Sequence, residues 1–133
     1  RAAQTAAPGD AALPVQGVAK LLRRMVRNLL ENARRYGQSS QARASGEGIV
    51  LQLSQAETLV LLQVSDCGPG VPLAYRDRIF EPFFRLPGAS ERAGSVGLGL
   101  ALVKSIAERH QGRVTCEDRT GGGACFIVRL PQL

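Results

Sequence analysis

Two asparagines on one predicted helix are the first residues whose type and spacing could do chemistry. Asn28 and Asn32 lie four residues apart in segment 18–36, where apolar residues recur at helical spacing, so both amides share a face beside the apolar stripe. An amide oxygen is a hard, neutral ligand that suits Mg²⁺ together with water and substrate phosphates. Two polar surface residues placed together by chance would give the same pattern, so the helix alone leaves both interpretations open.

A carboxylate stands before a glycine turn at the end of the second predicted strand. Asp66 is followed by Gly68 and Gly70, and glycines let the backbone turn sharply close to a ligand. An aspartate in this position could accept a hydrogen bond from an amino group. An ordinary Asp-Gly turn would have the same sequence, so the motif by itself only nominates a binding element.

A second glycine-rich segment, 94–99, leads directly into another predicted helix. The first amide N–H groups of a helix lack intrahelical partners and lie at its positive end, so such a start is a potential phosphate site. Arg85 and Arg92 precede this start and could approach the same phosphates. The alternative is a flexible lead-in to the helix with two solvated arginines.

The predicted elements that position these residues do not alternate strictly between strand and helix, which disfavours a doubly wound dinucleotide fold. They are a helix at 18–36, strands at 49–53 and 58–64 joined by a turn at 54–57, a short helix at 73–79, a helix at 100–110, and strands at 113–117 and 124–130 joined by a glycine turn. Residues 1–17 are expected to form a lead-in that could be partly disordered, and 18–133 one domain. The pattern predicts a two-layer α/β (α+β) sandwich, with helices on one face of a mixed, mostly antiparallel sheet.

Composition narrows the classes of function. Hydrophobic residues make up 44% of the 133 residues, and no apolar run approaches the roughly 18 residues of a membrane helix. Three cysteines without a pairing or zinc-binding spacing suit a reducing cytoplasm. A single histidine argues against a histidine-rich metal site, and the net charge of +6 predicts an anionic partner.

Three of the four phenylalanines fall within five residues, at Phe80, Phe83 and Phe84. At least two of the three are expected to pack in the core. An exposed phenylalanine in this cluster would instead mark a docking surface.

Four motifs, taken in order, strongly resemble the four boxes of the ATP-binding domain of bacterial sensor histidine kinases. They are NLLENA at 28–33, DCGPG at 66–70, IFEPFFR at 79–85 and GLGLALV at 97–103. Each motif is weak alone, but their order and spacing over about residues 18–131 are specific. The resemblance implies the Bergerat ATP-binding fold, which agrees with the sandwich predicted from the pattern.

The resemblance also implies roles for residues of the first helix. Asn32 corresponds to the Mg²⁺ ligand, with Asn28 as a second metal-side or phosphate-side group. Arg35 stands where the family commonly has a basic residue facing the phosphates, so Asn28, Asn32 and Arg35 form the expected catalytic set. Tyr36 stands where an aromatic residue flanks the adenine.

The remaining motifs supply the rest of the expected nucleotide site. Asp66 resembles the carboxylate that recognises the exocyclic amine of adenine, and Gly68 and Gly70 let the chain pass the base. Segment 86–96 matches the lid over ATP. The residues expected around the phosphates are Arg85, Gly97, Leu98, Gly99 and Leu100.

The implied function is to bind Mg²⁺-ATP and donate its γ-phosphoryl group to a histidine on a separate dimerisation hairpin domain, in two-component signal transduction. A response regulator would be the next acceptor, and the parent protein a membrane-anchored homodimer with this domain in the cytoplasm. His110, at the end of the second long helix, is not the acceptor. Related ATPases carry a water-activating glutamate in place of Asn28, so slow intrinsic hydrolysis is expected.

Two other functions fit parts of the sequence. A stand-alone serine kinase or anti-sigma factor of the same fold is the alternative, although the phenylalanine-rich motif argues against it. A basic nucleic-acid-binding domain is suggested by charge alone. Its arginines are spread over all predicted elements, aromatic residues are few, and no recognised motif is present, so no nucleic-acid partner is expected.

Overall fold

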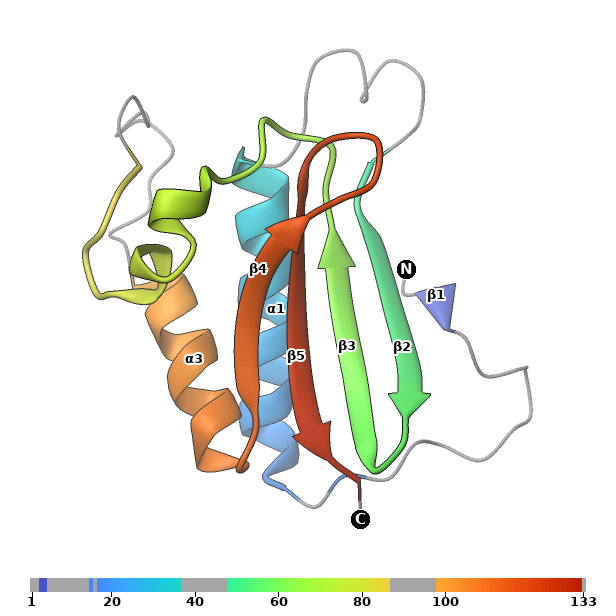
Figure 1. The fold of residues 1–133 in the computed structure, drawn as a ribbon. Helices are drawn as coiled ribbons and strands as arrows, with labels where there is room; N and C mark the ends of the chain where they lie inside the picture. The colour runs from blue at the N-terminus through green and yellow to red at the C-terminus, as the bar shows by residue number, and fades with distance from the viewer. Residues whose placement is uncertain (1–2, 5–14, 16, 37–47, 87–97, 133) are drawn as a thin grey trace.

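The computed structural model describes residues 3–4, 15, 17–36, 48–86 and 98–132 of the chain (Figure 1). A five-stranded sheet has the strand order β1-β2-β3-β5-β4. The elements are β1 (Ala3–Gln4), α1 (Ala19–Tyr36), β2 (Val50–Ala56), β3 (Leu59–Ser65), the 3₁₀ turns η1 (Leu73–Tyr75) and η2 (Arg78–Phe80), α3 (Gly99–Arg109), β4 (Arg113–Asp118) and β5 (Ala124–Pro131).

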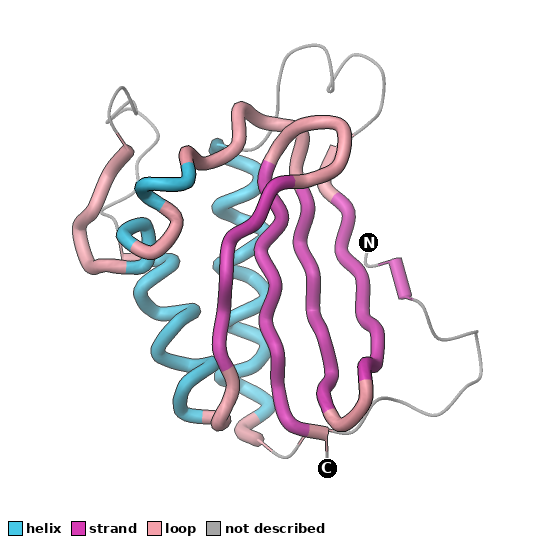
Figure 2. Tube along the Cα trace, viewed as in Figure 1, coloured by secondary structure: helices cyan, strands magenta, loops and turns pink. Residues whose placement is uncertain are grey.

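The predicted two-layer sandwich is confirmed. Strands β2, β3, β5 and β4 pair antiparallel, and β1 pairs parallel with β2, with Ala3 opposite Gln52. Both α-helices lie on the same face of the sheet (Figure 2). Part of the lead-in thus belongs to the sheet, while most of residues 1–17 lie outside the described ranges.

The core lies between the helices and the sheet. Helix α1 contributes Met25, Leu29 and Ala33, which follow one another at intervals of four residues and are at most 1% exposed. Strand β3 alternates between buried and half-buried residues, as expected for a strand with one face in a core. This packing fixes the rotation of α1, so the face that borders its apolar stripe stays accessible.

The turn between β2 and β3 is shorter than predicted. The ladder continues to the pair Ala56–Leu59, so only Glu57 and Thr58 form the turn, where the sequence indicated residues 54–57. Glu57 has a φ of 56°, a conformation that favours glycine or asparagine in two-residue hairpins. Because neither residue type is present, the local sequence contained no signal for the tighter turn.

The predicted helix at 73–79 is wrong, because two separate 3₁₀ turns replace it. Each is closed by a bond to the third residue before the donor, such as the 2.9 Å bond from the Glu81 N–H to the Arg78 carbonyl. A continuous α-helix would place Leu73 and Phe80 on one face. The break between η1 and η2 lets Phe80 enter the core while Leu73 remains 79% exposed.

His110 joins the end of α3 to the start of α1. It is 6% exposed, and its Nδ1 lies 2.8 Å from the Ile106 carbonyl oxygen, while its Nε2 accepts the Val18 N–H at 3.0 Å. The tautomer in which Nδ1 carries the proton and Nε2 accepts satisfies both contacts. The bond to Val18 connects residues 92 positions apart.

Candidate functional site

The asparagine strip of α1 meets the start of α3. The two helices lie side by side (Figure 1), and Asn28 Nδ2 is 3.4 Å from the Gly99 carbonyl oxygen. Leu98, at the N-cap of α3, makes no side-chain capping bond, so the first N–H groups of the helix keep their capacity to bind an anion. A Cβ added at Gly99 would meet no atom within 4 Å, which leaves open space at this start.

Asn32 lies one helical turn beyond Asn28 and is half-buried. Its amide makes no hydrogen bond with the part of the chain that the structure describes. A partly desolvated amide without a partner is available to a ligand. Among the described residues no group of three His, Cys, Asp or Glu side chains could hold a metal ion. The amide oxygen of Asn32 is a hard donor that could face a cation.

Arg35 is engaged by a carboxylate on its own helix. Its Nε lies 3.2 Å from Glu31 Oε1, and Arg34 pairs with the same carboxylate. The hydrogen bond from Arg34, and then that from Arg35, lowers the pKa of Glu31. Arg35 therefore lies near the asparagine strip with its charge partly compensated, and Tyr36 ends α1 with its side chain outside the described part of the structure.

Asp66 follows β3 and is held in a fixed position by the backbone. Its side chain belongs to a residue that is 4% exposed, and Oδ1 accepts the N–H groups of Gly68 and Ala124, each at 3.0 Å. Burial raises the pKa of Asp66, opposed by these two N–H groups and by the charge of Arg119. The second oxygen, Oδ2, accepts no hydrogen bond from the described residues and is the one that could receive a ligand donor.

The glycine turn after Asp66 packs directly on the hairpin between β4 and β5. Gly70 has a φ of 78°, and a Cβ there would lie 3.2 Å from the Gly123 carbonyl oxygen. At Gly123 an added Cβ would collide with the carbonyl oxygen of Asp66. Gly68 contributes its N–H to Asp66, so the predicted glycines and the unpredicted Gly123 together shape the turn.

Arg119 is a residue of the site that the sequence did not reveal. Its Nη1 donates to the Gly48 carbonyl at 3.1 Å and lies 3.0 Å from the Cys67 sulfur, so the hairpin side chain braces the turn next to Asp66. With Arg76, it lines an open depression of about 460 Å³ between the glycine turn and the hairpin. The contacts of Arg119 with Cys67 and Gly48 join residues 52 and 71 positions apart, so no local sequence pattern predicts them.

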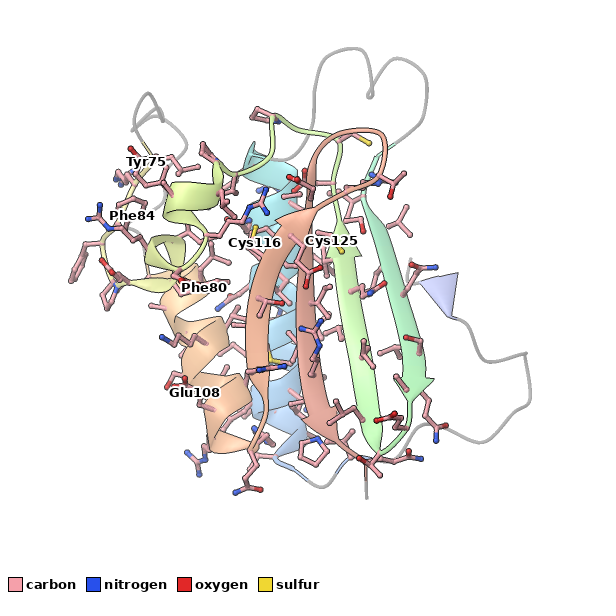
Figure 3. The ribbon with its side chains drawn as sticks, viewed as in Figure 1. Tyr75, Phe80, Phe84, Glu108, Cys116 and Cys125 are labelled. Atoms are coloured by element: carbon pink, nitrogen blue, oxygen red, sulfur yellow. The ribbon has the colours of Figure 1, made fainter. Side chains whose placement is uncertain are left out.

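Two of the three phenylalanines in and after η2 pack in or against the core, as expected, and the third is exposed. Phe80 is buried and meets Phe126 edge to face, with ring centroids 6.2 Å apart. Phe84 packs against Tyr75, with ring centroids 5.8 Å apart (Figure 3). The Arg78 guanidinium lies over the Phe84 ring, 4.7 Å from its centroid. Phe83 is 69% exposed and has a φ of 67°, which is uncommon for a large side chain.

The remaining predicted phosphate contacts are only partly described. Arg85 is half-buried, Leu98 is 42% exposed and Leu100 is half-buried at the start of α3. Gly97, Arg92 and the predicted lid beyond Leu86 lie outside the described residues. In the described part of the chain, none of the helices has the length and apolarity needed to cross a membrane.

The fold is that of a Bergerat-type ATP-binding domain. The chain belongs to the family described as histidine kinase-, DNA gyrase B- and HSP90-like ATPases, whose model matches residues 17–133. This confirms the resemblance seen in the four motifs.

Similar proteins are sensor kinases. The sensor histidine kinase GtrS of Pseudomonas aeruginosa is 40% identical over 125 residues, which cover 94% of this chain and 24% of GtrS. The sensor protein CutS of Streptomyces coelicolor is 40% identical over 121 residues, covering 88% of this chain and 27% of CutS. The chain thus spans about a quarter of the length of these relatives and corresponds to their catalytic ATPase part.

Solved structures of histidine kinases have the same fold as this chain. The mycobacterial sensor histidine kinase MprB superimposes with a TM-score of 0.72 at 30% identity, over 89% of this chain and 74% of that one. Full-length ShkA in complex with AMPPNP, an ATP analogue, gives a TM-score of 0.67 at 31% identity, over 84% of this chain and 21% of ShkA.

Proposed function

We propose that this domain binds Mg²⁺-ATP and donates the γ-phosphoryl group to a histidine on a separate helical hairpin domain. The observation that carries the proposal is the contact between Asn28 and the Gly99 carbonyl, which brings the asparagine strip to the start of α3. In the parent protein, a membrane-anchored homodimeric sensor kinase, the phosphoryl group would pass on to a response regulator. The relatives named above support this class of function.

Asp66 would bind the adenine. Its Oδ2 accepts the exocyclic amine, while the backbone N–H groups of Gly68 and Ala124 keep Oδ1 in place. Gly70 keeps the turn close to the base, and Tyr36 flanks it. A buried, fixed acceptor favours adenine over a base that presents an acceptor at the same place.

The phosphates would lie between the start of α3 and the asparagine strip. The uncapped N–H groups of α3, with Arg35 and Arg85, favour negative charge there. Asn32, with Asn28 beside it, would hold Mg²⁺, and the chemistry of an unpartnered amide oxygen fits that ion. When bound, Mg²⁺ neutralises charge on the phosphates.

Among the described residues, the asparagine strip offers no general base for water. The amide of Asn28 cannot accept a proton at neutral pH, and the neighbouring carboxylate, Glu31, is held by Arg34 and Arg35. Phosphoryl transfer needs positioning and charge neutralisation more than covalent help from the protein. The γ-phosphoryl group is therefore kept for a protein acceptor. His110 cannot be that acceptor, because both its ring nitrogens are engaged.

The central test is nucleotide binding followed by phosphotransfer. A fluorescent ATP analogue should bind the chain more tightly with Mg²⁺ than without it. Addition of a hairpin domain that carries an acceptor histidine should then yield acid-labile phosphate on the hairpin faster than free phosphate. No binding under either condition, or rapid steady-state hydrolysis by the chain alone, would overturn the proposal.

Phe83 is expected to dock on the hairpin domain. Phe83→Gly should lower the phosphotransfer rate by about tenfold, which corresponds to about 1.4 kcal/mol of lost contact. It should raise the stability of the domain by about 1 kcal/mol, because glycine adopts the positive φ of this position without strain. Initial phosphotransfer rates and thermal unfolding measure the two effects.

The matched control is Leu73→Ser, which removes another exposed apolar side chain. Phosphotransfer should change little in this variant, and the affinity for the ATP analogue should be the same in both. A normal transfer rate with Phe83→Gly would remove Phe83 from the docking surface.

A further inference from the structure

The surplus positive charge of the chain is concentrated on one face of α1. At about 100° per residue, six exposed cations fall within about 120° of the helix circumference. We call them the basic stripe: Lys20, Arg23, Arg24, Arg27, Arg34 and Arg35. One carboxylate, Glu31, lies among them, so six cations less one anion give +5, against +6 for the whole chain.

The basic stripe lies opposite the side chains that hold α1 in the fold. Met25, Leu29 and Ala33 point into the core from the other side of the helix. Glu31 pairs with Arg34 and Arg35. The other four cations, in the first half of the helix, form no ion pair with any residue in the described ranges. Neither packing nor local charge compensation therefore explains this half of the stripe.

The position of Lys20 in the first turn, and the like-charge spacing of three of these cations, work against the helix. The N-terminus of a helix carries a partial positive charge, and α1 has no acidic residue in its first turn. Lys20, Arg24 and Arg27 also follow one another at spacings of four and three residues, where like charges repel. Folding alone would favour other residues here, which indicates that the charge serves an external partner.

We propose that the basic stripe is a docking surface for an acidic helix of a partner protein. The stripe extends over 15 residue steps, or about 22 Å at the rise of an α-helix, and presents a cation at nearly every turn. Carboxylates on one face of another helix recur at the same intervals. Five of the six cations are arginines, whose guanidinium groups bind carboxylates in a two-pronged manner.

Two other anionic surfaces fit less well. A helix that binds a bilayer inserts its apolar face, and the apolar face of α1 is committed to the core. A single-stranded nucleic acid needs aromatic side chains for stacking, and the basic stripe has none. The regular spacing of the cations along a single helix therefore favours an acidic helix.

Two charge-matched variants of the 133-residue chain test the proposal. The stripe variant is Lys20→Gln/Arg24→Gln/Arg27→Gln, and the control, Lys104→Gln/Arg109→Gln/Arg113→Gln, removes three exposed cations from α3 and β4. The probe is a synthetic helical peptide of about 20 residues with glutamates on one face. A peptide of the same composition with its glutamates distributed around the helix, phosphatidylserine vesicles and a DNA duplex are compared at about 150 mM salt.

The stripe variant should bind the one-faced peptide about tenfold more weakly than the original chain, and the control by less than about threefold. Its melting temperature should not fall, because Lys20 opposes the helix dipole and the three removed charges repel one another. Its affinity for the ATP analogue should be unchanged. These two readouts separate the result from misfolding and from failure of the proposed function.

Four results would each overturn the proposal. Equal losses in both variants would mean that net charge alone matters, and equal binding of the second peptide would mean that spacing does not. Tighter, stripe-dependent binding of vesicles or duplex would assign the surface to lipid or nucleic acid. A parallel loss of ATP affinity would assign the stripe to the nucleotide site.

Discussion

Replacing Asp66 with asparagine should lower the affinity for ATP about 100-fold while leaving the domain at least as stable at neutral pH. In this variant the adenine amine would face an amide N–H donor or a neutral amide oxygen instead of a carboxylate oxygen. The affinity should fall because a hydrogen bond to a charged group is worth about 1.5–3 kcal/mol. Fold stability should persist because an asparagine Oδ1 can still accept the N–H groups of Gly68 and Ala124.

The sign of the pH dependence follows from the raised pKa of Asp66. Burial makes the folded protein bind this proton more tightly than the unfolded chain does. The stability that the group contributes is present below the ordinary aspartate pKa of 3.8 and is lost as the pH rises through the raised value. The stability advantage of Asp66→Asn should therefore be greatest at neutral pH and shrink as the pH falls towards 3.8.

Calorimetric titration with an ATP analogue and thermal unfolding between about pH 4 and pH 8 measure both effects. Asp77→Asn is the matched control, since Asp77 is exposed and makes no capping bond with its side chain. The wild-type chain should also lose ATP affinity on acidification at a higher pH than an ordinary aspartate would dictate. Unchanged ATP affinity in Asp66→Asn would remove Asp66 from the adenine site.

Asn32→Ala should abolish the part of ATP affinity that depends on Mg²⁺. The variant removes an amide oxygen that has no partner among the described residues, so no contact within this part of the chain is lost. Alanine is the better helix former by up to about 0.7 kcal/mol, so the domain should become slightly more stable. Asn32→Asp is expected to lose the Mg²⁺-dependent affinity too, because it adds a negative charge beside the phosphates.

Affinity for the ATP analogue, measured with Mg²⁺ and with a chelator, separates this effect from a general loss of binding. Asn32→Ala should bind equally well under both conditions, at the affinity that the original chain shows with chelator. Ser105→Ala, an exposed position on α3, serves as control and should keep the full Mg²⁺ response. Unchanged affinity of Asn32→Ala for Mg²⁺-ATP would refute the assignment of Asn32 as the metal ligand.

Elements with their own hydrophobic period could be predicted from the sequence. The helical spacing of apolar residues placed α1 to within a residue of its bounds, Ala19–Tyr36, and the strand pattern placed β5 similarly well. In contrast, β1 has two residues and exists through pairing of Ala3 with Gln52. A two-residue strand has no period, so a contact between segments 49 residues apart decides its structure.

The candidate site shows the same division. Asn28, Asp66 and Gly99 could be nominated by residue type, because an amide, a carboxylate and a glycine before a helix each suggest a chemistry. The hydrogen bonds that hold Asp66 could not be predicted. One donor is the backbone N–H of Ala124, and because every residue but proline has such a group, residue type does not identify it. Arg119 was missed because its contacts are set by the approach of the hairpin to the glycine turn.

The close packing of the β4–β5 hairpin against the glycine turn also determines which glycines of the hairpin can be replaced. Gly121, Gly122 and Gly123 all have positive φ, but an added Cβ would meet open space at the first two. A lineage can replace Gly121 or Gly122 at the expense of backbone strain alone. At Gly123 a side chain would strike the Asp66 carbonyl oxygen, a backbone atom that cannot swing aside, and would displace the neighbouring Ala124 N–H from the carboxylate. Substitution in this turn is therefore expected to cost less stability at Gly121 and Gly122 than at Gly123.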